Sequence, residues 1–239
     1  MQKSQRHSER LTSEMRHITD PIAALVQAIP AQGSPRRLIG LVGLPGAGKS
    51  TQAELWAKII NREFQQPVAQ AVSMDGFHLT RAQLDLMANP QEAHARRGSY
   101  WTFDAESLAQ SLESLRRSTV DGVPSETGWP TFDHEAGDPV PNGQIVVADT
   151  RLVILEGLYL LLGREDGWRV REVLDEVWFL ATDLDQAMHQ LEARHCRVWR
   201  ITPEEARARI AGNDLLNAQK VESTRARADA WVDPLPLTF

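Results

Sequence analysis

A glycine-rich segment lies between an apolar run and a helical pattern in "LIGLVGLPGAGKSTQAELWAKII", residues 38–60. It fits the spacing G-x-x-x-x-G-K-[ST], with Gly43, Gly48, Lys49 and Ser50 at the fixed positions. Glycines let the backbone curl so that several N–H groups point inward, and those donors bind phosphate beside a helix N-terminus. Lys49 would bridge the outer phosphates and Ser50 would ligate Mg²⁺. The predicted nucleotide-binding residues are Gly43, Pro45, Gly46, Ala47, Gly48, Lys49, Ser50 and Thr51.

Asp75 follows a second strand pattern, "PVAQAVSMD", residues 67–75. Open α/β sheets bind ligands at the carboxyl ends of their strands. A carboxylate there can accept the proton of a substrate hydroxyl as that hydroxyl attacks the γ-phosphorus. Asp-Gly also forms plain turns, but the phosphate-binding segment upstream favours the catalytic interpretation. His78 is a weaker candidate for substrate binding, since a lone histidine is more often simply hydrogen-bonded.

A third strand pattern, "RLVILEG" (151–157), ends at Glu156. Its carboxylate can hold Mg²⁺ through water or contact substrate, and the alternative is an acidic strand terminus. Downstream, residues 193–219 carry three candidate arginines. A cation that closes over the transferring phosphoryl group stabilises charge in the transition state. For any single arginine, however, a position on a solvated helix face is the commoner reason for its presence. Of Arg194, Arg197 and Arg200, we favour Arg194 and Arg197 as catalytic residues.

Composition narrows the class of protein. The chain has 239 residues and a formal net charge of −6, which gives no indication of a nucleic-acid partner. No apolar run approaches the roughly 20 residues of a membrane span. The single cysteine, Cys196, excludes an internal disulfide and favours a reducing compartment, so we expect a cytoplasmic protein without a membrane partner. No Asn-Lys-x-Asp run follows the glycine-rich segment, so ATP is favoured over GTP.

Strand patterns alternate with helical patterns around these residues. Strands are predicted over residues 38–43, 67–75, 151–157, 176–181 and 228–233. Helices are predicted over residues 49–62, 80–89, 104–117, 183–198 and 202–222. This alternation implies a mainly parallel sheet with helices on both faces, so the predicted fold class is a three-layer α/β sandwich.

Two segments depart from this alternation. Residues 11–29 carry apolar side chains at helical spacing, with Asp20-Pro21 as a helix start or a break inside it. Residues 119–145 are rich in Pro, Gly and Asp and predict a hairpin or a long loop. We expect an N-terminal helical extension over 1–35 and a main domain over 36–239, with a hairpin at about 119–150 and a lid at about 194–205.

Six segments, taken in order, resemble a known family: "GLPGAGKST", "VSMDGFH", "RRGSYWTFDAESL", "PTFDHEAGDPV", "VILEGLYLLL" and "RHCRVW…EEARARIAGNDLLNA". Together they are similar to the phosphoribulokinase/uridine kinase family of P-loop kinases, and most of all to its bacterial fructokinase-like and pantothenate-kinase-like branch. The resemblance covers about residues 36–233. It implies the P-loop nucleotide-kinase fold and a transfer of phosphate from ATP, with Mg²⁺, to a hydroxyl of a small molecule.

The resemblance also implies roles for individual residues. Asp75 matches the family's catalytic base, and Glu156 matches the acidic residue of its "EG" motif. Further substrate-binding candidates, ahead of Arg96, are Arg97, Phe132, Asp133 and His134. Phe132 stands where uridine and pantothenate kinases carry a tyrosine. Asn213 and Asp214 match an Asn-Asp pair of the branch to which we assign no role.

The acceptor is the open question. A sugar or sugar-like polyol is the first expectation, because the branch resembles sugar kinases and the candidate pocket segments are polar. A nucleoside or pantothenate is the second. A regulatory ATP-binding protein without kinase activity is an alternative of another class, although Asp75 argues against it. By analogy with similar kinases, a homodimer is also expected.

Overall fold

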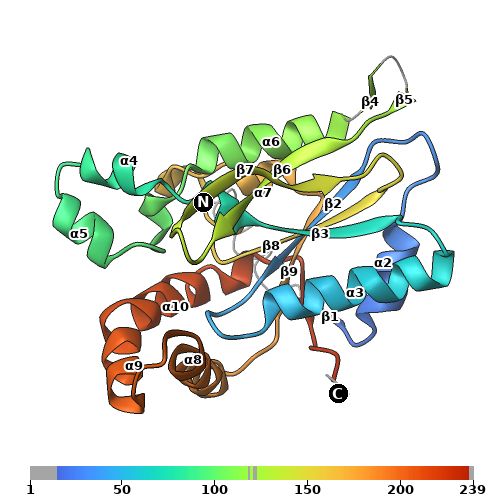
Figure 1. The fold of residues 1–239 in the computed structure, drawn as a ribbon. Coiled ribbons are helices and arrows are strands. Elements are labelled where there is room, and N and C mark those ends of the chain that lie inside the picture. Colours follow the sequence, from blue (N-terminus) through green and yellow to red (C-terminus); the bar gives the residue numbers. More distant parts are fainter. Residues whose placement is uncertain (1–14, 118, 121–122, 237–239) are drawn as a thin grey trace, which may run out of the picture.

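The computed structural model describes residues 15–117, 119–120 and 123–236. A sheet of six strands forms its centre, in the order β1-β10-β9-β2-β8-β3, and all five pairings are parallel (Figure 1). The predicted parallel sheet is therefore confirmed. The strands are β1 (Arg16–Ile18), β2 (Arg37–Val42), β3 (Ala69–Ser73), β8 (Leu152–Gly157), β9 (Glu176–Leu180) and β10 (Ala230–Val232).

Helices cover both faces of this sheet, as the alternating pattern predicted. Figure 1 shows α2 and α3 on one face and α6 and α7 on the other. The α-helices are α2 (Pro21–Ala28), α3 (Lys49–Phe64), α4 (Arg81–Asp85), α5 (Pro90–Ala95), α6 (Ala105–Arg117), α7 (Val170–Val173), α8 (Leu184–Trp199), α9 (Pro203–Arg209) and α10 (Leu215–Glu222). Short 3₁₀ turns are η2 (Met74–Phe77), η3 (Tyr100–Thr102), η4 (Arg164–Asp166) and η6 (Arg225–Arg227). Among the residues described, no helix is long and apolar enough to cross a membrane.

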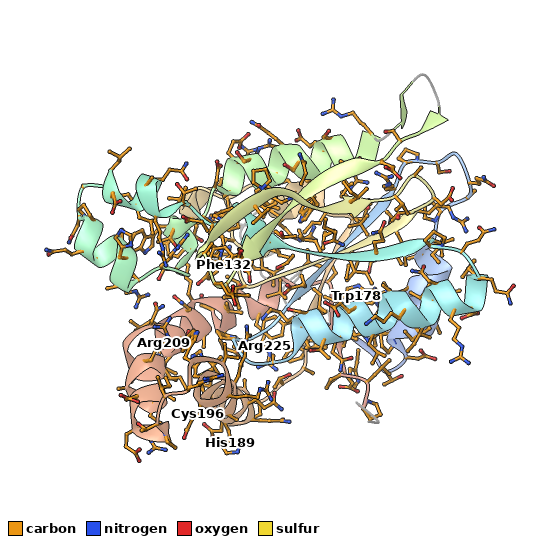
Figure 2. The ribbon with its side chains drawn as sticks, viewed as in Figure 1. Phe132, Trp178, His189, Cys196, Arg209 and Arg225 are labelled. Carbon is orange, nitrogen blue, oxygen red and sulfur yellow. The ribbon has the colours of Figure 1, made fainter. Side chains whose placement is uncertain are left out.

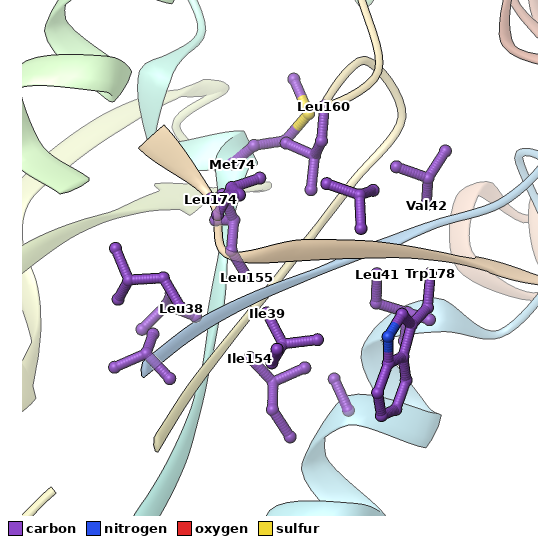
Figure 3. Packing of buried hydrophobic residues seen from close by; sticks show 14 of the residues in the cluster. Leu38, Ile39, Leu41, Val42, Met74, Ile154, Leu155, Leu160, Leu174 and Trp178 are labelled. Atoms are coloured by element: carbon purple, nitrogen blue, oxygen red, sulfur yellow. The ribbon is translucent and has the colours of Figure 1, made fainter. Parts of the chain in front are cut away.

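The core lies between the sheet and these helices. All six residues of β8 are buried, as expected for a central parallel strand covered on both faces. Trp178 on β9 projects toward α3 (Figure 2), and its ring centroid lies 6.4 Å from that of Trp56. Figure 3 shows Trp178 beside the apolar side chains of β2, including Leu41. This packing fixes β2 and α3, the two elements that hold the glycine-rich segment.

The N-terminal prediction is partly wrong. Residues 16–18 form β1, which pairs in parallel with β10, and are not part of a helix. The helix begins later, because Asp20 caps it by accepting from the Ala23 N–H at 2.9 Å and Pro21 occupies its first turn. The strand arises from hydrogen bonds to a segment more than 200 residues away, which local spacing cannot reveal. Residues 11–14 of that prediction lie outside the described residues.

The predicted hairpin is present. β6 (Thr127–Asp133) and β7 (Asp138–Val146) pair antiparallel, and a shorter pair, β4 (Thr119–Val120) and β5 (Val123–Pro124), precedes them. The longer hairpin is fastened to β3 by two side chains. The Trp129 indole N–H donates to the Ser73 carbonyl at 2.9 Å, and the Gln144 amide donates to the Ala71 carbonyl at 2.8 Å. The hairpin therefore reaches the carboxyl end of β3.

Two predicted helices are broken in the structure. The helix expected over 80–89 ends at Asp85, and Asn89 then caps the separate helix α5. The helix expected over 202–222 is interrupted by a π-helical turn, η5 (Ile210–Asp214), between α9 and α10. The first break has a local cause, because Asn89 accepts from the Glu92 N–H and Pro90 lies in the first turn of α5.

Candidate active site

The glycine-rich loop connects β2 to α3 and wraps the start of that helix. Gly46 and Gly48 have φ values of 82° and 83°, which L-residues with a side chain rarely adopt. A Cβ on Gly46 would lie 2.3 Å from the Ala187 carbonyl oxygen, so α8 packs directly on the loop. No side chain caps the N-terminus of α3. Its first N–H groups thus remain available to an anion such as phosphate.

Three charged side chains converge at the carboxyl ends of β2, β3 and β8. Ser73 of β3 is the register partner of Glu156 of β8, so Asp75, two residues further, and Glu156 meet at one edge. Lys49 begins α3 beside them and is 8% exposed, and its ammonium group donates to the Leu44 carbonyl at 3.0 Å. Glu156 is 7% exposed. One buried lysine is therefore held close to two carboxylates.

Burial dominates the electrostatics of this cluster. It raises the pKa of Asp75, and the charge of Lys49 opposes that rise. Burial likewise raises the pKa of Glu156, with Asp75 adding to the rise and Lys49 and the hydroxyls of Ser73 and Ser50 opposing it. Burial lowers the pKa of Lys49, against the attraction of Glu156 and Asp75. A carboxylate with a raised pKa is better suited to accept a proton than an exposed one.

A cleft of about 660 Å³ opens over this cluster. The predicted site residues that line it are Pro45, Gly46, Lys49, Ser50, Asp75, His78, Arg97, Phe132, His134, Glu156 and Arg194. The predicted residues that do not line it are Gly43, Ala47, Gly48, Thr51, Asp133 and Arg197. In Figure 2, Phe132 lies on the hairpin side of the cleft and Arg209 on the side of α9 and α10.

His78 holds the backbone of Asp75. Its Nδ1 lies 2.8 Å from the Asp75 carbonyl oxygen, and its ring lies 4.0 Å from the ring of Phe103 and 4.6 Å from that of Phe132. Burial lowers the pKa of His78 to about 4. The neutral ring therefore donates its Nδ1–H to the carbonyl, which makes His78 a positioning residue for Asp75.

Arg97 fastens the hairpin to the segment after η2. Its guanidinium donates to the carbonyls of Gly137 and of Leu79, the latter at 2.7 Å, and to the Asp138 carboxylate at 3.0 Å. It also lies 5.2 Å over the Phe132 ring. Of the three Arg97 side-chain nitrogens, Nε alone is buried without a hydrogen-bond partner among the described residues. Arg97 thus has a structural role at the cleft wall that the sequence did not reveal.

Asp133 has a similar local role within the hairpin. Its carboxylate accepts from the backbone N–H groups of Glu135 at 2.8 Å and Ala136 at 3.1 Å. These bonds form the turn between β6 and β7. The predicted substrate contact through Asp133 therefore has no support in the cleft geometry.

One face of α8 lines the cleft, through Leu191, Arg194, His195, Val198 and Trp199. This spacing is that of a single helical face, and Arg197 lies off it. Arg194 lies near enough to Lys49 and Asp75 to affect their pKa values. The geometry therefore separates the two arginines that the sequence had grouped: Arg194 faces the charged cluster and Arg197 does not.

Trp199 and Arg209 line the cleft but were missed at the sequence level, and Asp214, which had no assigned role, lines it as well. The Arg209 guanidinium lies 4.0 Å over the Trp199 ring. His195 bonds the Asp214 carboxylate at 2.9 Å, while the neighbouring Asn213 amide donates to the Arg97 carbonyl at 3.1 Å. The π-helical turn thus joins α8 to the Arg97 segment, which gives the Asn-Asp pair a structural role.

The cleft also fits a magnesium ion. The hydroxyl of Ser50 and the carboxylates of Glu156 and Asp75 are hard oxygen ligands of the kind that Mg²⁺ prefers. Within the described part of the chain, no group of three or more His, Cys, Asp or Glu side chains could hold a metal alone. This donor set suits an ion that takes its remaining ligands from phosphates and water.

Comparison with known proteins finds a matching family. The model of the phosphoribulokinase/uridine kinase family matches residues 38–195. A Schizosaccharomyces pombe protein provisionally named a uridine kinase is 37% identical over 207 residues, which cover 84% of this chain and 85% of that protein.

Two solved structures share the fold over most of the chain. A protein of Silicibacter sp. TM1040, provisionally named a fructose transport system kinase, has a TM-score of 0.75 and 29% identity, covering 91% of this chain and 100% of its own. YFH7 of Saccharomyces cerevisiae, provisionally described as a P-loop containing kinase with a circular permutation, has a TM-score of 0.76 and 25% identity, covering 89% and 97%.

Proposed function

We propose, from the premise that the chain belongs to the phosphoribulokinase/uridine kinase family and is a small-molecule kinase, that its acceptor is a sugar or sugar-like polyol. In this family ATP is the phosphate donor and Mg²⁺ its usual companion. The observation that carries the proposal is the cluster of buried Lys49, buried Glu156 and half-buried Asp75 beneath a cleft of about 660 Å³.

The donor would bind along the glycine-rich loop. Backbone N–H groups from Gly46 to Thr51 and the uncapped start of α3 would hold its phosphates. Lys49 would contact the outer phosphates, and Ser50 and Glu156 would hold the magnesium ion. Bound magnesium would neutralise charge that develops on the phosphates.

The acceptor hydroxyl would bind next to Asp75. Its raised pKa prepares this carboxylate to accept the hydroxyl proton as the oxygen attacks the γ-phosphorus. Arg194, which faces the charged cluster from α8, would stabilise charge on the transferring phosphoryl group. His78 would keep the Asp75 backbone in place, and the hairpin residues Phe132 and His134 would contact the acceptor.

The choice of a sugar over a nucleoside rests on two observations. The cleft wall opposite α8 offers polar and charged groups, with Gln144 and His134 among them, as a polyol requires. The Silicibacter protein carries a name that refers to fructose transport. The name of the Schizosaccharomyces relative keeps nucleosides as the second candidate. A cytoplasmic location and a homodimer are further parts of this proposal, supported by the single cysteine and by analogy.

The test is ADP release from ATP and Mg²⁺ in the presence of sugars, polyols, nucleosides and pantothenate, each assayed separately. We expect stimulation by one class of polyol, and loss of that stimulation in Asp75→Asn. Stimulation by nucleosides alone would replace the sugar assignment with the second candidate. If no compound stimulates ADP release while ATP still binds tightly, a regulatory ATP-binding protein would be favoured.

A further inference from the structure

We propose that Arg209, which packs on Trp199, forms an anion-binding subsite for the acceptor. The acceptor is then a polyol that already carries a carboxylate or a phosphate before the reaction. This inference rests on the proposed function and narrows its substrate class. It starts from the arginines that line the cleft among the described residues: Arg97, Arg194 and Arg209. They differ in how many hydrogen bonds and ion pairs their guanidinium groups form within the protein.

Arg209 is a cation that the protein has not neutralised. Arg97 is committed to the hairpin through three acceptors. Arg194 and Arg209 form no hydrogen bond or ion pair with any residue that the structure describes. Arg194 lies near Lys49 and Asp75, where the transferring phosphoryl group needs positive charge. Of the three arginines, Arg209 is therefore the one to which neither the hairpin nor the transferring phosphoryl group gives a partner.

The cleft carboxylates do not balance Arg209 either. Asp75 and Glu156 face Lys49, and Asp214 is paired with His195 at 2.9 Å. The remaining cleft carboxylate, Glu54, lies on α3 with Lys58 as its ion-pair partner at 3.9 Å. Because each carboxylate has another partner, the guanidinium of Arg209 is open to an anionic ligand.

Arg209 lies on the acceptor side of the cleft. α8 touches the glycine-rich loop at Ala187 and Leu191, through the approach of Gly46. Trp199 lies eight residues beyond Leu191, which is roughly 12 Å along a helix axis. The turn that follows Arg209 contacts the Arg97 segment, since the Asn213 amide donates to the Arg97 carbonyl. Arg209 thus lies between the phosphate loop and the segment that holds the hairpin.

The guanidinium also packs on an aromatic side chain. It lies 4.0 Å over the Trp199 ring, and His195 stacks on the same ring at 4.2 Å with an angle of 18° between planes. His195 is in turn bonded to Asp214, five residues after Arg209 in the π-helical turn. A guanidinium stacked on an aromatic face keeps its N–H edge free for a bidentate bond to carboxylate or phosphate.

The experiment measures steady-state kinetics with three matched acceptors: a neutral polyol, the corresponding sugar acid and the corresponding sugar phosphate. The variants are Arg209→Gln, the conservative Arg209→Lys, and the control Arg207→Gln. Arg207 lies on the same helix but is exposed and paired with Glu192 and Glu204 outside the cleft. Thermal denaturation of each variant verifies that it is folded.

We expect the parent to prefer an anionic acceptor, and the preferred anion identifies the group as carboxylate or phosphate. Loss of a charge-assisted pair should raise KM for that acceptor by roughly 10–100-fold in Arg209→Gln. The value of kcat and the KM for ATP should change little. Arg209→Lys should recover part of the affinity, and Arg207→Gln should resemble the parent.

Two results would overturn the subsite: equal use of neutral and anionic acceptors by the parent, or an equal rise in KM for both in Arg209→Gln. If no compound is phosphorylated, the proposed function fails, and calorimetric titration of the same compounds still decides about the subsite. Tighter binding of an anionic compound by the parent than by Arg209→Gln would support it. Binding that is absent, or equal in the two proteins, would refute it.

Discussion

The two ends of the cleft are built in different ways. At the phosphate end, Lys49 and Glu156 are buried and lie on or directly beside central elements of the sheet. At the acceptor end, Arg209 and Trp199 are exposed side chains, and their neighbours come from the hairpin, the Arg97 segment and the π-helical turn. The first end depends on the core for its geometry, whereas the second depends on contacts among peripheral segments.

This difference has a functional consequence. Charges buried near the sheet keep fixed positions and shifted pKa values, as phosphoryl transfer requires. Peripheral segments can differ between related proteins without disturbing the core, so we expect substrate choice to depend on them. We therefore expect changes at Lys49 and the glycine-rich loop to affect ATP binding and turnover together. Changes at the acceptor end should affect the acceptor alone.

The largest effect on ATP binding and turnover together is expected from Lys49→Ala. Removal of the only cation among the cluster residues should lower turnover by roughly 10²–10³ or more, because the transferred phosphoryl group loses its main positive contact. The buried Glu156 and the half-buried Asp75 would also be left facing each other without a cation, so the melting temperature should fall. Lys58→Ala is the control, since Lys58 lies on the same helix and is 77% exposed. Full activity in Lys49→Ala would contradict the assignment of the phosphate site.

A smaller and more selective effect is expected from Gly76→Ala. A Cβ at this position would lie 2.1 Å from the Pro130 carbonyl oxygen, so the hairpin has to shift away from η2. The acceptor KM should rise by about tenfold, because displaced groups no longer meet the acceptor. ATP affinity should stay at the parent value. A comparable loss of ATP affinity would show that the two ends are not separable.

The smallest effect concerns pH and stability. His78 stays neutral in the folded protein down to about pH 4, whereas the unfolded chain protonates it near its ordinary pKa of 6.5. The neutral His78 ring therefore contributes fully to the free energy of unfolding above pH 6.5. This contribution is lost as the pH falls toward 4, because the unfolded chain binds the proton first. His78→Phe keeps the ring contacts and removes this titration. Between pH 7 and pH 5, the parent should lose about 1–2 kcal/mol more of its unfolding free energy than the variant. Chemical denaturation at both pH values measures this, and identical losses would contradict it.

Local sequence patterns predicted which charged residues meet at the phosphate end. Its glycines, Lys49 and Ser50 are contiguous, and the strands that carry Asp75 and Glu156 are apolar runs with a carboxylate at or just beyond the end. Each of these features is determined within about ten residues. The alternation of strands and helices also revealed the parallel sheet.

The acceptor end was less predictable because it depends on tertiary contacts. Arg194 and Arg197 looked equivalent in the sequence, and only the helical face that packs toward the loop distinguishes them. Arg209 had no local signal, since its importance comes from Trp199, ten residues earlier across a turn. Similarly, β1 is a strand only because β10 is there to pair with it.

The most direct test of the account is a comparison of Asp75→Asn with the parent in two assays: ATP binding by calorimetry, and turnover with the preferred acceptor. Asn keeps the size of the side chain but cannot accept the hydroxyl proton as a carboxylate does. We predict ATP affinity near the parent value and a fall in turnover of about 10²–10⁴. Near-normal turnover would contradict the role of Asp75 as the base, and with it the mechanism assigned to the buried cluster.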